Sequence, residues 1–546
     1  MAPTSKNPSE AEREEIQPSG QVARSAGIVG LAVMVSRIFG LVREQVFAAF
    51  FGASMVYDAF LMAFRIPNLL RDLFAEGALS AAFVTTFSQH VTQKGEAAAW
   101  RLANLVLNAL ILILLPLTIL GMIFSPQIVD LIAPGFRAIP GKTELTAEMT
   151  SIMFPFILLV ALATVAMGIL NTKDRFGIPA SASTFFNLGS IVGGLAFAYA
   201  IDPHFGPRAI VGMAIGTLIG GMLQFLVQLP SLRHVGYRYR PLVDFTDPGV
   251  VQIMRLMGPA IIGTGAVQIN VLVNSSFASY LGNGPVSWLG YAFRFMQFPI
   301  GLFGVAIGTA TLPSISRAAA RGDLAEFRKT LASSLGMVFL FCIPSAFGLA
   351  VLGEPIVSLI YQRGHFTAAD TRQTAAALAF YAVGLTGYAA IKVLAPAFYA
   401  LKDARTPMIV GVVSIATNYV LNLLLVERFG HRGLAMATSG VALVNFLALF
   451  FLIKRKIGHI EGRRIFQSLW KILLASAAMA AASWTAYAGI SPQMGPGLGG
   501  QLANALIPIA AGTAVFFLLA RLLAVADLES AERALLGKFL RRSSKE

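Results

Sequence analysis

The sequence predicts an all-α integral membrane protein with about fourteen transmembrane helices. Of its 546 residues, 56% are hydrophobic and only 13% are charged, whereas a soluble domain carries about 25% charged residues. The mean hydropathy is +0.71, and the apolar residues form stretches long enough to cross a bilayer, separated by short polar loops. These three observations exclude most classes of soluble protein.

The apolar stretches place the expected helices along the chain. Several exceed the roughly 20 residues that a span requires, so we expect tilts or breaks. Pro67 and Pro299 are predicted break points because proline removes a helical hydrogen bond. Residues 1–25 and 526–546 are expected to form polar cytoplasmic tails. The spans are predicted at 26–52, 56–92, 98–124, 146–170, 179–201, 208–230, 249–282, 285–316, 328–352, 368–400, 407–426, 433–453, 469–489 and 500–522.

The basic residues indicate how the chain is oriented in the membrane. Most of the 42 Lys and Arg residues lie in segments that face the cytoplasm if both termini are inside, as in other multi-pass proteins. This bias explains the net charge of +15 without a nucleic-acid partner. The basic residues inside predicted spans are Arg37, Arg43, Arg65, Arg71, Arg255, Arg294 and Lys392.

The residue types that bind metals are sparse. There is one cysteine, Cys342, and none of the six histidines has the spacing of metal ligands. We therefore predict no metal site and no cofactor.

A weak internal repeat divides the chain into two halves. Three stretches recur in the same order at nearly one offset, which is typical of transporters whose halves are related by an axis along the membrane normal. We therefore expect two pseudo-symmetric six-helix lobes, residues 26–231 and 248–457, followed by two extra helices within 466–525. The repeated pairs are 42–52 with 272–282, 56–65 with 286–294, and 76–88 with 304–316.

The arginines inside the spans are the strongest functional signal. An arginine at the centre of a lipid-facing helix costs about 2.5–3.5 kcal/mol on insertion scales, so several of them require ion pairs or a water-filled cavity. If the second span is one continuous helix, Asp58, Arg65, Asp72 and Glu76 share one stripe, which favours structural ion pairing for Arg65.

The remaining arginines are less well matched with acids. Arg37 shares a face with Glu44, whereas Arg43 points about 120° away on a helical wheel. Two interpretations stay open for this set: lining of an anion-binding cavity, which we favour, or buried structural pairing. Guanidinium groups bind phosphate oxygens through parallel hydrogen bonds, so a cavity of this kind would attract a diphosphate. The poorly neutralised set is Arg37, Arg43, Arg71 and Arg294.

Three runs of the sequence resemble the MurJ (MviN) family of lipid II flippases, within the multidrug/oligosaccharidyl-lipid/polysaccharide exporter superfamily. The resemblance covers about residues 26–525 and implies two lobes facing a central cavity, with the two last helices forming a groove for the undecaprenyl tail. It also implies the bacterial cytoplasmic (inner) membrane as location. The runs are SRIFGLVRE (36–44), FGASMVYDAFLMAFRIPNLLRDLFAEGALSAAFV (51–84) and WLGYAFRFMQFPIGLFGVAIGTATLPSIS (288–316).

The resemblance also implies roles for individual residues. The functional arginines of the family correspond to Arg37, Arg43, Arg71 and Arg294, and a functional acid corresponds to Asp58. Supporting positions correspond to Ser36, Asn68, Glu76 and Ser287.

This sequence departs from the family pattern in three places, one of which is Arg71–Asp72, where relatives often carry a basic pair. Phe293 and Gln297 stand beside Arg294 where relatives often carry acids. Some relatives bind sodium through an acid in the seventh span, but residues 249–282 contain only Asn270 and Asn274 as candidates. We therefore expect no sodium site.

The expected function is export of lipid II, an undecaprenyl-diphosphate-linked disaccharide-peptide, across the membrane by alternating access for cell-wall synthesis. No bond is broken, so the protein is expected to be a transporter and not an enzyme. We expect a monomer, because the two halves already form the pseudo-symmetric pair. The alternatives are a polysaccharide-repeat flippase or multidrug antiporter of the same superfamily, or a membrane glycosyltransferase or cell-wall scaffold.

Overall fold

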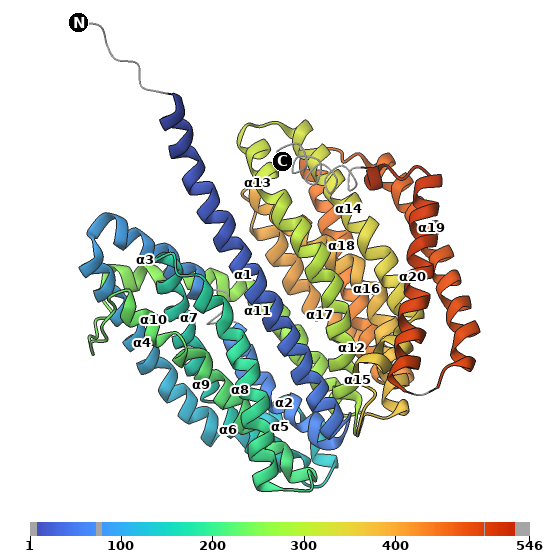
Figure 1. The fold of residues 1–546 in the computed structure, drawn as a ribbon, viewed down its shortest axis with the longest axis horizontal. Helices are drawn as coiled ribbons and strands as arrows, with labels where there is room; N and C mark the ends of the chain where they lie inside the picture. The colour runs from blue at the N-terminus through green and yellow to red at the C-terminus, as the bar shows by residue number, and fades with distance from the viewer. Residues whose placement is uncertain (1–7, 73–78, 496, 530–546) are drawn as a thin grey trace, which may run out of the picture. The chain divides into compact units, whose positions relative to one another are not determined.

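The computed structural model describes residues 8–72, 79–495 and 497–529, and all regular secondary structure within them is helical (Figure 1). Eleven of the helical segments are long and apolar enough to cross a membrane. The predicted fold class, an all-α membrane protein, is confirmed.

The count of fourteen spans is not confirmed. Three predicted spans are absent from the eleven, and they correspond to α1 (Pro8–Phe51), to α2 (Met55–Leu70) with α3 (Ser80–Lys94), and to α11 (Pro248–Ser279). These segments contain charged or amide side chains within their apolar stretches. The eleven were found among the described residues, in which α2 and α3 have 16 and 15 residues and are each shorter than a span.

The chain divides into two compact units that are each discontinuous in sequence. Unit 1 comprises residues 1–47, 59–131 and 140–265, and unit 2 comprises 48–58, 132–139 and 266–546. The connection between α1 and α2 therefore packs within unit 2, although the chain on both sides of it belongs to unit 1. The boundaries of the two lobes and the C-terminal pair remain predictions.

Unit 1 has an aromatic core. Phe83 and Phe87 of α3 stack with ring centroids 5.3 Å apart, and both are fully buried. Helices α4 and α7 complete this core around Leu102 and Val165. The other helices that form this unit are α4 (Glu96–Ile123), α6 (Lys142–Met153), α7 (Phe156–Thr172), α8 (Gly177–Ile201), α9 (Ile210–Leu226) and α10 (Leu229–His234), while α5 (Ser125–Ile132) ends at its boundary.

Unit 2 is built around α16 (Ala368–Ala400), which packs against α12, α14 and α18. Close approach is possible because glycines face the neighbouring helix: a Cβ at Gly384 would lie 2.5 Å from Ser439. The other helices of the unit are α12 (Pro285–Pro299), α13 (Ala306–Ala320), α14 (Leu324–Val351), α15 (Gly353–Tyr361), α17 (Arg405–Phe429), α18 (His431–Ile457), α19 (Gly462–Ile490) and α20 (Leu498–Leu522).

Both predicted proline breaks coincide with irregular helix. Helix α12 ends at Pro299 and continues as a π-helix over Ile300–Val305. Helix α2 contains Pro67 and ends three residues later at Leu70, where a π-helical turn begins. Such turns widen a helix locally and are frequent at functional sites.

Helices α8 and α9 of unit 1 pack with their backbones in contact. Gly212, Gly216 and Gly220 fall four residues apart on one face of α9, and a Cβ at Gly216 would lie 2.3 Å from the backbone of Gly194. In a bilayer, where no hydrophobic effect drives helices together, small residues permit the close packing that holds them. The pair runs side by side along its length (Figure 1).

Enlarging Gly216 is expected to separate these helices. We expect Gly216→Val to destabilise the purified protein by about 1–3 kcal/mol, the usual range for overpacking, and to lower its thermal unfolding temperature. Gly258→Val is the matched control, because a Cβ at Gly258 meets nothing within 4 Å. Equal unfolding temperatures for the two variants would contradict the packing described here.

Candidate functional site

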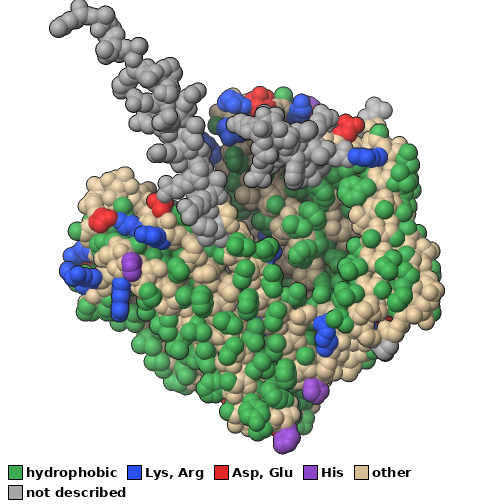
Figure 2. Space-filling model, in the orientation of Figure 1, with side chains coloured by type: hydrophobic (Ala, Val, Ile, Leu, Met, Phe, Trp, Pro, Cys, Tyr) green, Lys and Arg blue, Asp and Glu red, His purple; other side chains and the backbone are tan. Residues whose placement is uncertain are grey.

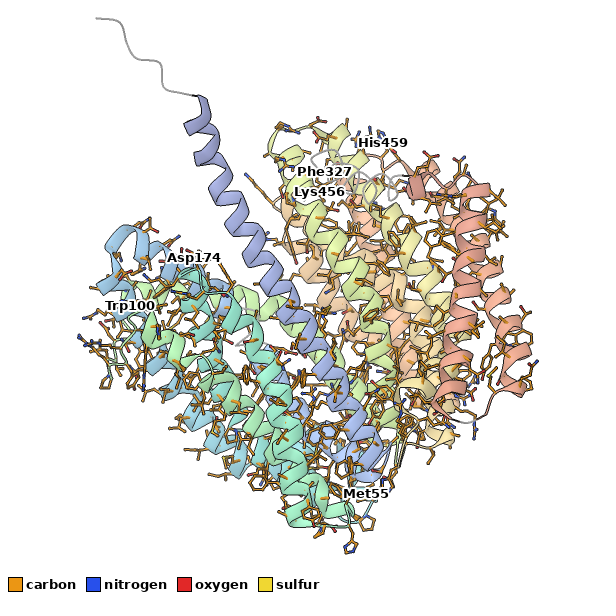
Figure 3. All side chains as sticks on the ribbon, viewed as in Figure 1. Met55, Trp100, Asp174, Phe327, Lys456 and His459 are labelled. Atoms are coloured by element: carbon orange, nitrogen blue, oxygen red, sulfur yellow. The ribbon has the colours of Figure 1, made fainter. Side chains whose placement is uncertain are left out.

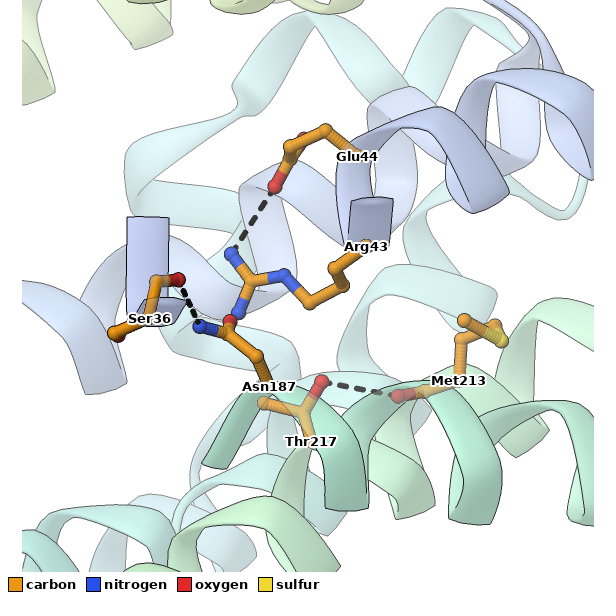
Figure 4. Close-up of polar contacts among 6 residues, drawn as sticks. All are labelled: Ser36, Arg43, Glu44, Asn187, Met213 and Thr217. Atoms are coloured by element: carbon orange, nitrogen blue, oxygen red, sulfur yellow. Dashed lines mark hydrogen bonds and ion pairs between the residues drawn. The ribbon is translucent and has the colours of Figure 1, made fainter. Parts of the chain in front are cut away.

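The first two predicted arginines lie on α1. Arg43 donates to the carboxylate of Glu44 at 3.0 Å (Figure 4). Its guanidinium carbon lies 5.2 Å from the centroid of the Phe186 ring on α8. The neighbouring Asn187 donates from Nδ2 to the backbone carbonyl of Ser36 at 3.2 Å. Ser36 and Arg43 are seven residues apart, so one face of α1 packs against α8 within unit 1.

The pairing with Glu44 corrects the assignment of Arg43 to the poorly neutralised set. The prediction considered only residues on the same helical face, and adjacent positions are separated by about 100°. A long arginine side chain can fold across that angle, and Glu44 is buried, so the guanidinium compensates a carboxylate that water does not solvate. Arg43 is therefore partly neutralised.

Arg71 requires the same correction. Its Nε and Nη2 donate to Oδ1 of Asp72 at 3.2 and 2.8 Å, and Asn68 donates to Oδ2 at 3.4 Å. Asp72 thus joins two of the predicted site residues, Asn68 and Arg71. A uniform helical wheel does not apply here because α2 ends at Leu70.

The predicted acidic stripe through Arg65 assumed regular α-helical spacing from Asp58 onward. Helix α2 ends at Leu70 and continues as a π-helical turn at Arg71 and Asp72, so Asp72 departs from that spacing. Glu76 itself lies outside the described residues.

Two arginines of the set remain. Arg37 is exposed on α1, and none of the residues that the structure describes forms an ion pair with it. Arg294 is half-buried on α12 in unit 2. Arg37, Arg43 and Arg71 thus belong to unit 1, and Arg294 belongs to unit 2.

Asp58 and Ser287, both predicted from the resemblance, meet in unit 2 although 229 residues separate them. Asp58 is fully buried. Its Oδ1 accepts hydrogen bonds from the backbone N–H of Ser287 at 2.9 Å and from the Ser287 hydroxyl at 2.5 Å. Its Oδ2 accepts from the N–H of Gly284 at 2.7 Å.

The carboxylate of Asp58 therefore caps a helix from a distant part of the chain. Helix α12 begins at Pro285, and the N–H groups of the first turn of a helix have no partners within the helix. A negative charge at a helix N-terminus is also favoured by the helix dipole. Asp58 is thus a structural anchor of the segment that leads to Arg294, a role that the sequence did not reveal.

An aromatic cluster that sequence reasoning missed surrounds this anchor. Tyr57 stacks on Tyr291 with centroids 5.2 Å apart, and Tyr291 lies 4.6 Å from Tyr361. Beside it, Trp288 Nε1 donates to Asp370 at 2.9 Å. These residues come from α2, α12, α15 and α16, and their scattered positions carry no common sequence signal.

The described geometry of Arg43 suits reversible anion binding. A guanidinium group has five N–H donors, and the contact with Glu44 engages only one nitrogen of Arg43. The pair therefore holds this arginine in place, and its buried Nε has no hydrogen-bond partner among the described residues.

Replacement of Asp58 by Asn is expected to be strongly disruptive. The Asp58 carboxylate accepts the three hydrogen bonds given above, so the amide that replaces it would face at least one of these donors with its own N–H. We expect Asp58→Asn to destabilise the protein by about 1–3 kcal/mol, the usual effect of an unsatisfied buried polar group. Thermal unfolding measures this, with the exposed Glu354→Gln as control. An unchanged unfolding temperature for Asp58→Asn would argue against the cap.

Comparison with known proteins identifies the family of the chain. A family model described as lipid II flippase MurJ matches residues 47–498. The lipid II flippase MurJ of Burkholderia cenocepacia is 38% identical over 427 residues, covering 78% of this chain and 82% of that protein. The probable lipid II flippase MurJ of Buchnera aphidicola subsp. Acyrthosiphon pisum is 36% identical over 452 residues, covering 83% and 87%.

Solved structures show the same fold. A lipid II flippase MurJ in an inward closed conformation superposes with a TM-score of 0.74 at 28% identity, covering 93% of this chain and 99% of that one. An inward-facing multidrug resistance transporter of the MATE family, in the MOP superfamily, superposes with a TM-score of 0.60 at 16% identity, covering 79% and 94%. The second likeness concerns the fold alone. The family model and the curated relatives together establish that the chain belongs to the MurJ family.

Proposed function

We propose that this protein is a lipid II flippase that exports the undecaprenyl-diphosphate-linked cell-wall precursor across the bacterial cytoplasmic membrane by alternating access. Family membership supports the substrate. The observation that carries the proposal is the excess of arginine over acid within residues 36–72. We propose Arg37, Arg43, Arg71 and Arg294 as the residues that bind the diphosphate.

The charge balance supports an anionic cargo. Residues 36–72 contain four arginines against Glu44, Asp58 and Asp72, and Asp58 is already engaged at the N-terminus of α12. A multidrug antiporter for cations would need the opposite balance. Several guanidinium groups in a hydrated site can instead surround a diphosphate with parallel hydrogen bonds.

The ion pairs of Arg43 and Arg71 support transport over permanent binding. A transporter must release its cargo, so its binding groups cannot hold the diphosphate too tightly. Glu44 and Asp72 compete with phosphate oxygens for the same donors, which lowers the affinity for the headgroup. We propose that these acids allow release.

The membrane potential can supply energy for this movement. Moving one charge across a membrane is worth about 2.3 kcal/mol per 100 mV, and an anion leaving a cell that is negative inside moves downhill. For two diphosphate charges the gain is roughly twice as large. We propose that the potential drives export or resets the basic site.

The other features of the proposal follow from the family and the sequence. The protein acts as a monomeric transporter without covalent catalysis, and both termini face the cytoplasm. The lobes comprise 26–231 and 248–457, and the helices within 466–525 form the groove for the polyprenyl tail. A polysaccharide-repeat flippase would use the same phosphate chemistry, but the curated relatives favour lipid II.

Neutralising the proposed arginines is expected to slow flipping. We expect Arg37→Gln, Arg43→Gln, Arg71→Gln and Arg294→Gln each to reduce lipid II translocation in proteoliposomes by about tenfold or more, because each lost charge-assisted hydrogen bond contributes about 1.5–3 kcal/mol. The control is Arg255→Gln, which removes an exposed arginine of α11. Wild-type rates in a variant with all four replaced would refute the proposed site.

A second measurement tests the energy source. We expect lipid II export by proteoliposomes to accelerate when a potential is imposed that is negative on the side of the donor leaflet. An export rate that is independent of the potential would contradict the proposed role of the membrane potential. It would not contradict the proposed diphosphate-binding residues.

A further inference from the structure

Two buried asparagines of α4 hold the chain that connects α10 to α11 in an extended course. We call residues 237–242 the strap. The side chain of Asn104 donates to the carbonyl of Arg238 at 3.1 Å and accepts from the N–H of Arg240 at 2.8 Å. It also accepts from the hydroxyl of Tyr237 at 2.8 Å. A single amide thus binds three points of the strap.

Asn108, one helical turn further along α4, repeats this pattern on the next part of the strap. It donates to the carbonyls of Arg240 and Leu242 at 2.8 and 3.0 Å. It accepts from the hydroxyl of Tyr239 at 2.6 Å. Buried amides are costly unless they are hydrogen-bonded; here both side chains are used to fix one short segment, which is ordered and is not a freely solvated loop.

The strap and the residues just after it present basic and apolar side chains together. Arg238 and Arg240 are exposed. Tyr239, Val243 and Phe245 are 57%, 53% and 43% exposed. Large apolar side chains beside arginines, on a backbone whose carbonyls are satisfied internally, are typical of a segment that lies in a membrane interface.

The acids nearby are already engaged. Hydrogen bonds from Thr246 lower the pKa of Asp244 below its usual range, and its carboxylate lies 3.7 Å from Arg101. Asp247 accepts from the N–H of Gly249 at 2.8 Å, at the start of α11. Within the described parts of the chain, no acid forms an ion pair with Arg238 or Arg240, so their charges are available to an external anion.

The position along α4 places the strap near the surface of the bilayer. Helix α4 has 28 residues, which span about 42 Å at 1.5 Å per residue, whereas the hydrocarbon core is about 30 Å thick. The excess corresponds to roughly eight residues. The polar end of α4 carries Glu96 and Arg101. If the extra eight residues extend out of the hydrocarbon core at this end, Asn104 lies at the edge of the core. Lys and Arg side chains gather at this end of unit 1 in Figure 2, near Trp100 in Figure 3.

We propose that the strap is an interfacial anchor of unit 1 that binds the headgroups of anionic phospholipids, with Arg238 and Arg240 on the phosphates and Val243 and Phe245 in the acyl boundary. Each basic residue near an anionic membrane surface contributes about 1 kcal/mol to membrane binding. The two exposed arginines of the strap would therefore contribute about 2 kcal/mol together. The anchor consists of residues other than the four proposed diphosphate-binding arginines, and it would hold whether or not the protein flips lipid II.

A label at position 243 tests the proposal on the full chain. The native Cys342 is buried, so a Val243→Cys variant can be labelled selectively with a spin label. In vesicles of phosphatidylglycerol we expect the label to be accessible to oxygen and shielded from a water-soluble relaxant, and in vesicles of phosphatidylcholine to be less shielded. A label equally exposed to water in both lipids would overturn the proposal.

Charge variants distinguish lipid binding at the strap from attraction by the net positive charge of the protein. In detergent, titration of the labelled protein with short-chain phosphatidylglycerol should give an apparent affinity about thirtyfold weaker for Arg238→Gln/Arg240→Gln, since two charges of about 1 kcal/mol each are lost. The control is Lys454→Gln/Arg455→Gln, which removes the same charge from exposed positions at the end of α18 and should leave the affinity within about twofold. Equal losses of phosphatidylglycerol affinity in both double variants would show that the lipid is attracted by net charge and not by the strap, and would overturn the proposal.

Two further measurements exclude other occupants and an indirect effect. Inorganic diphosphate or a soluble acidic polypeptide that shifts the label as phosphatidylglycerol does would identify a soluble anion as the ligand and overturn the lipid assignment. Asn108→Ala should increase hydrogen exchange at residues 239–242 and weaken lipid binding although both arginines remain. Unchanged lipid binding with a loosened strap would refute the claim that the fixed backbone forms the site.

Discussion

A polar group in the hydrocarbon part of a bilayer has no water to bind, so burying it without a partner is costly. Several features of this structure answer that requirement with contacts between distant parts of the chain. Asp58 satisfies the N-terminus of α12, and Asn104 and Asn108 satisfy the strap. Within shorter reach, Glu44 and Asp72 hold arginines. Polar side chains of these helices therefore link segments that are distant in the sequence.

The same requirement explains how the units are built. Residues 48–58 include the connection between α1 and α2 and the first turn of α2, and they belong to unit 2. Asp58 and Tyr57 in this segment have partners in unit 2. Where no polar contact is available, glycines let helices approach until their backbones touch, as between α8 and α9. Polar anchors thus specify the partners, and small residues permit the close packing.

The proposed diphosphate site is a compromise between burial and function. Arginines without any acid would be costly to bury in the membrane, and arginines fully neutralised would not bind an anion. Arg43 and Arg71 are each paired with the adjacent acid, which holds the guanidinium in place without cancelling the charge of the whole set. The balance still favours arginine, and that residual charge is what the proposed transport requires.

The sequence by itself determined the membrane class, the helical architecture and the family, because hydropathy and local motifs depend only on residues close together in the chain. It also selected the arginines and brought Asp58 and Ser287 into the candidate set through the resemblance. Only the tertiary structure decided that these two meet, that Arg43 and Arg71 fold onto neighbouring acids, and that the buried asparagines of α4 hold the strap. These contacts depend on side-chain conformation and on segments up to 229 residues apart, which neither helical periodicity nor composition describes.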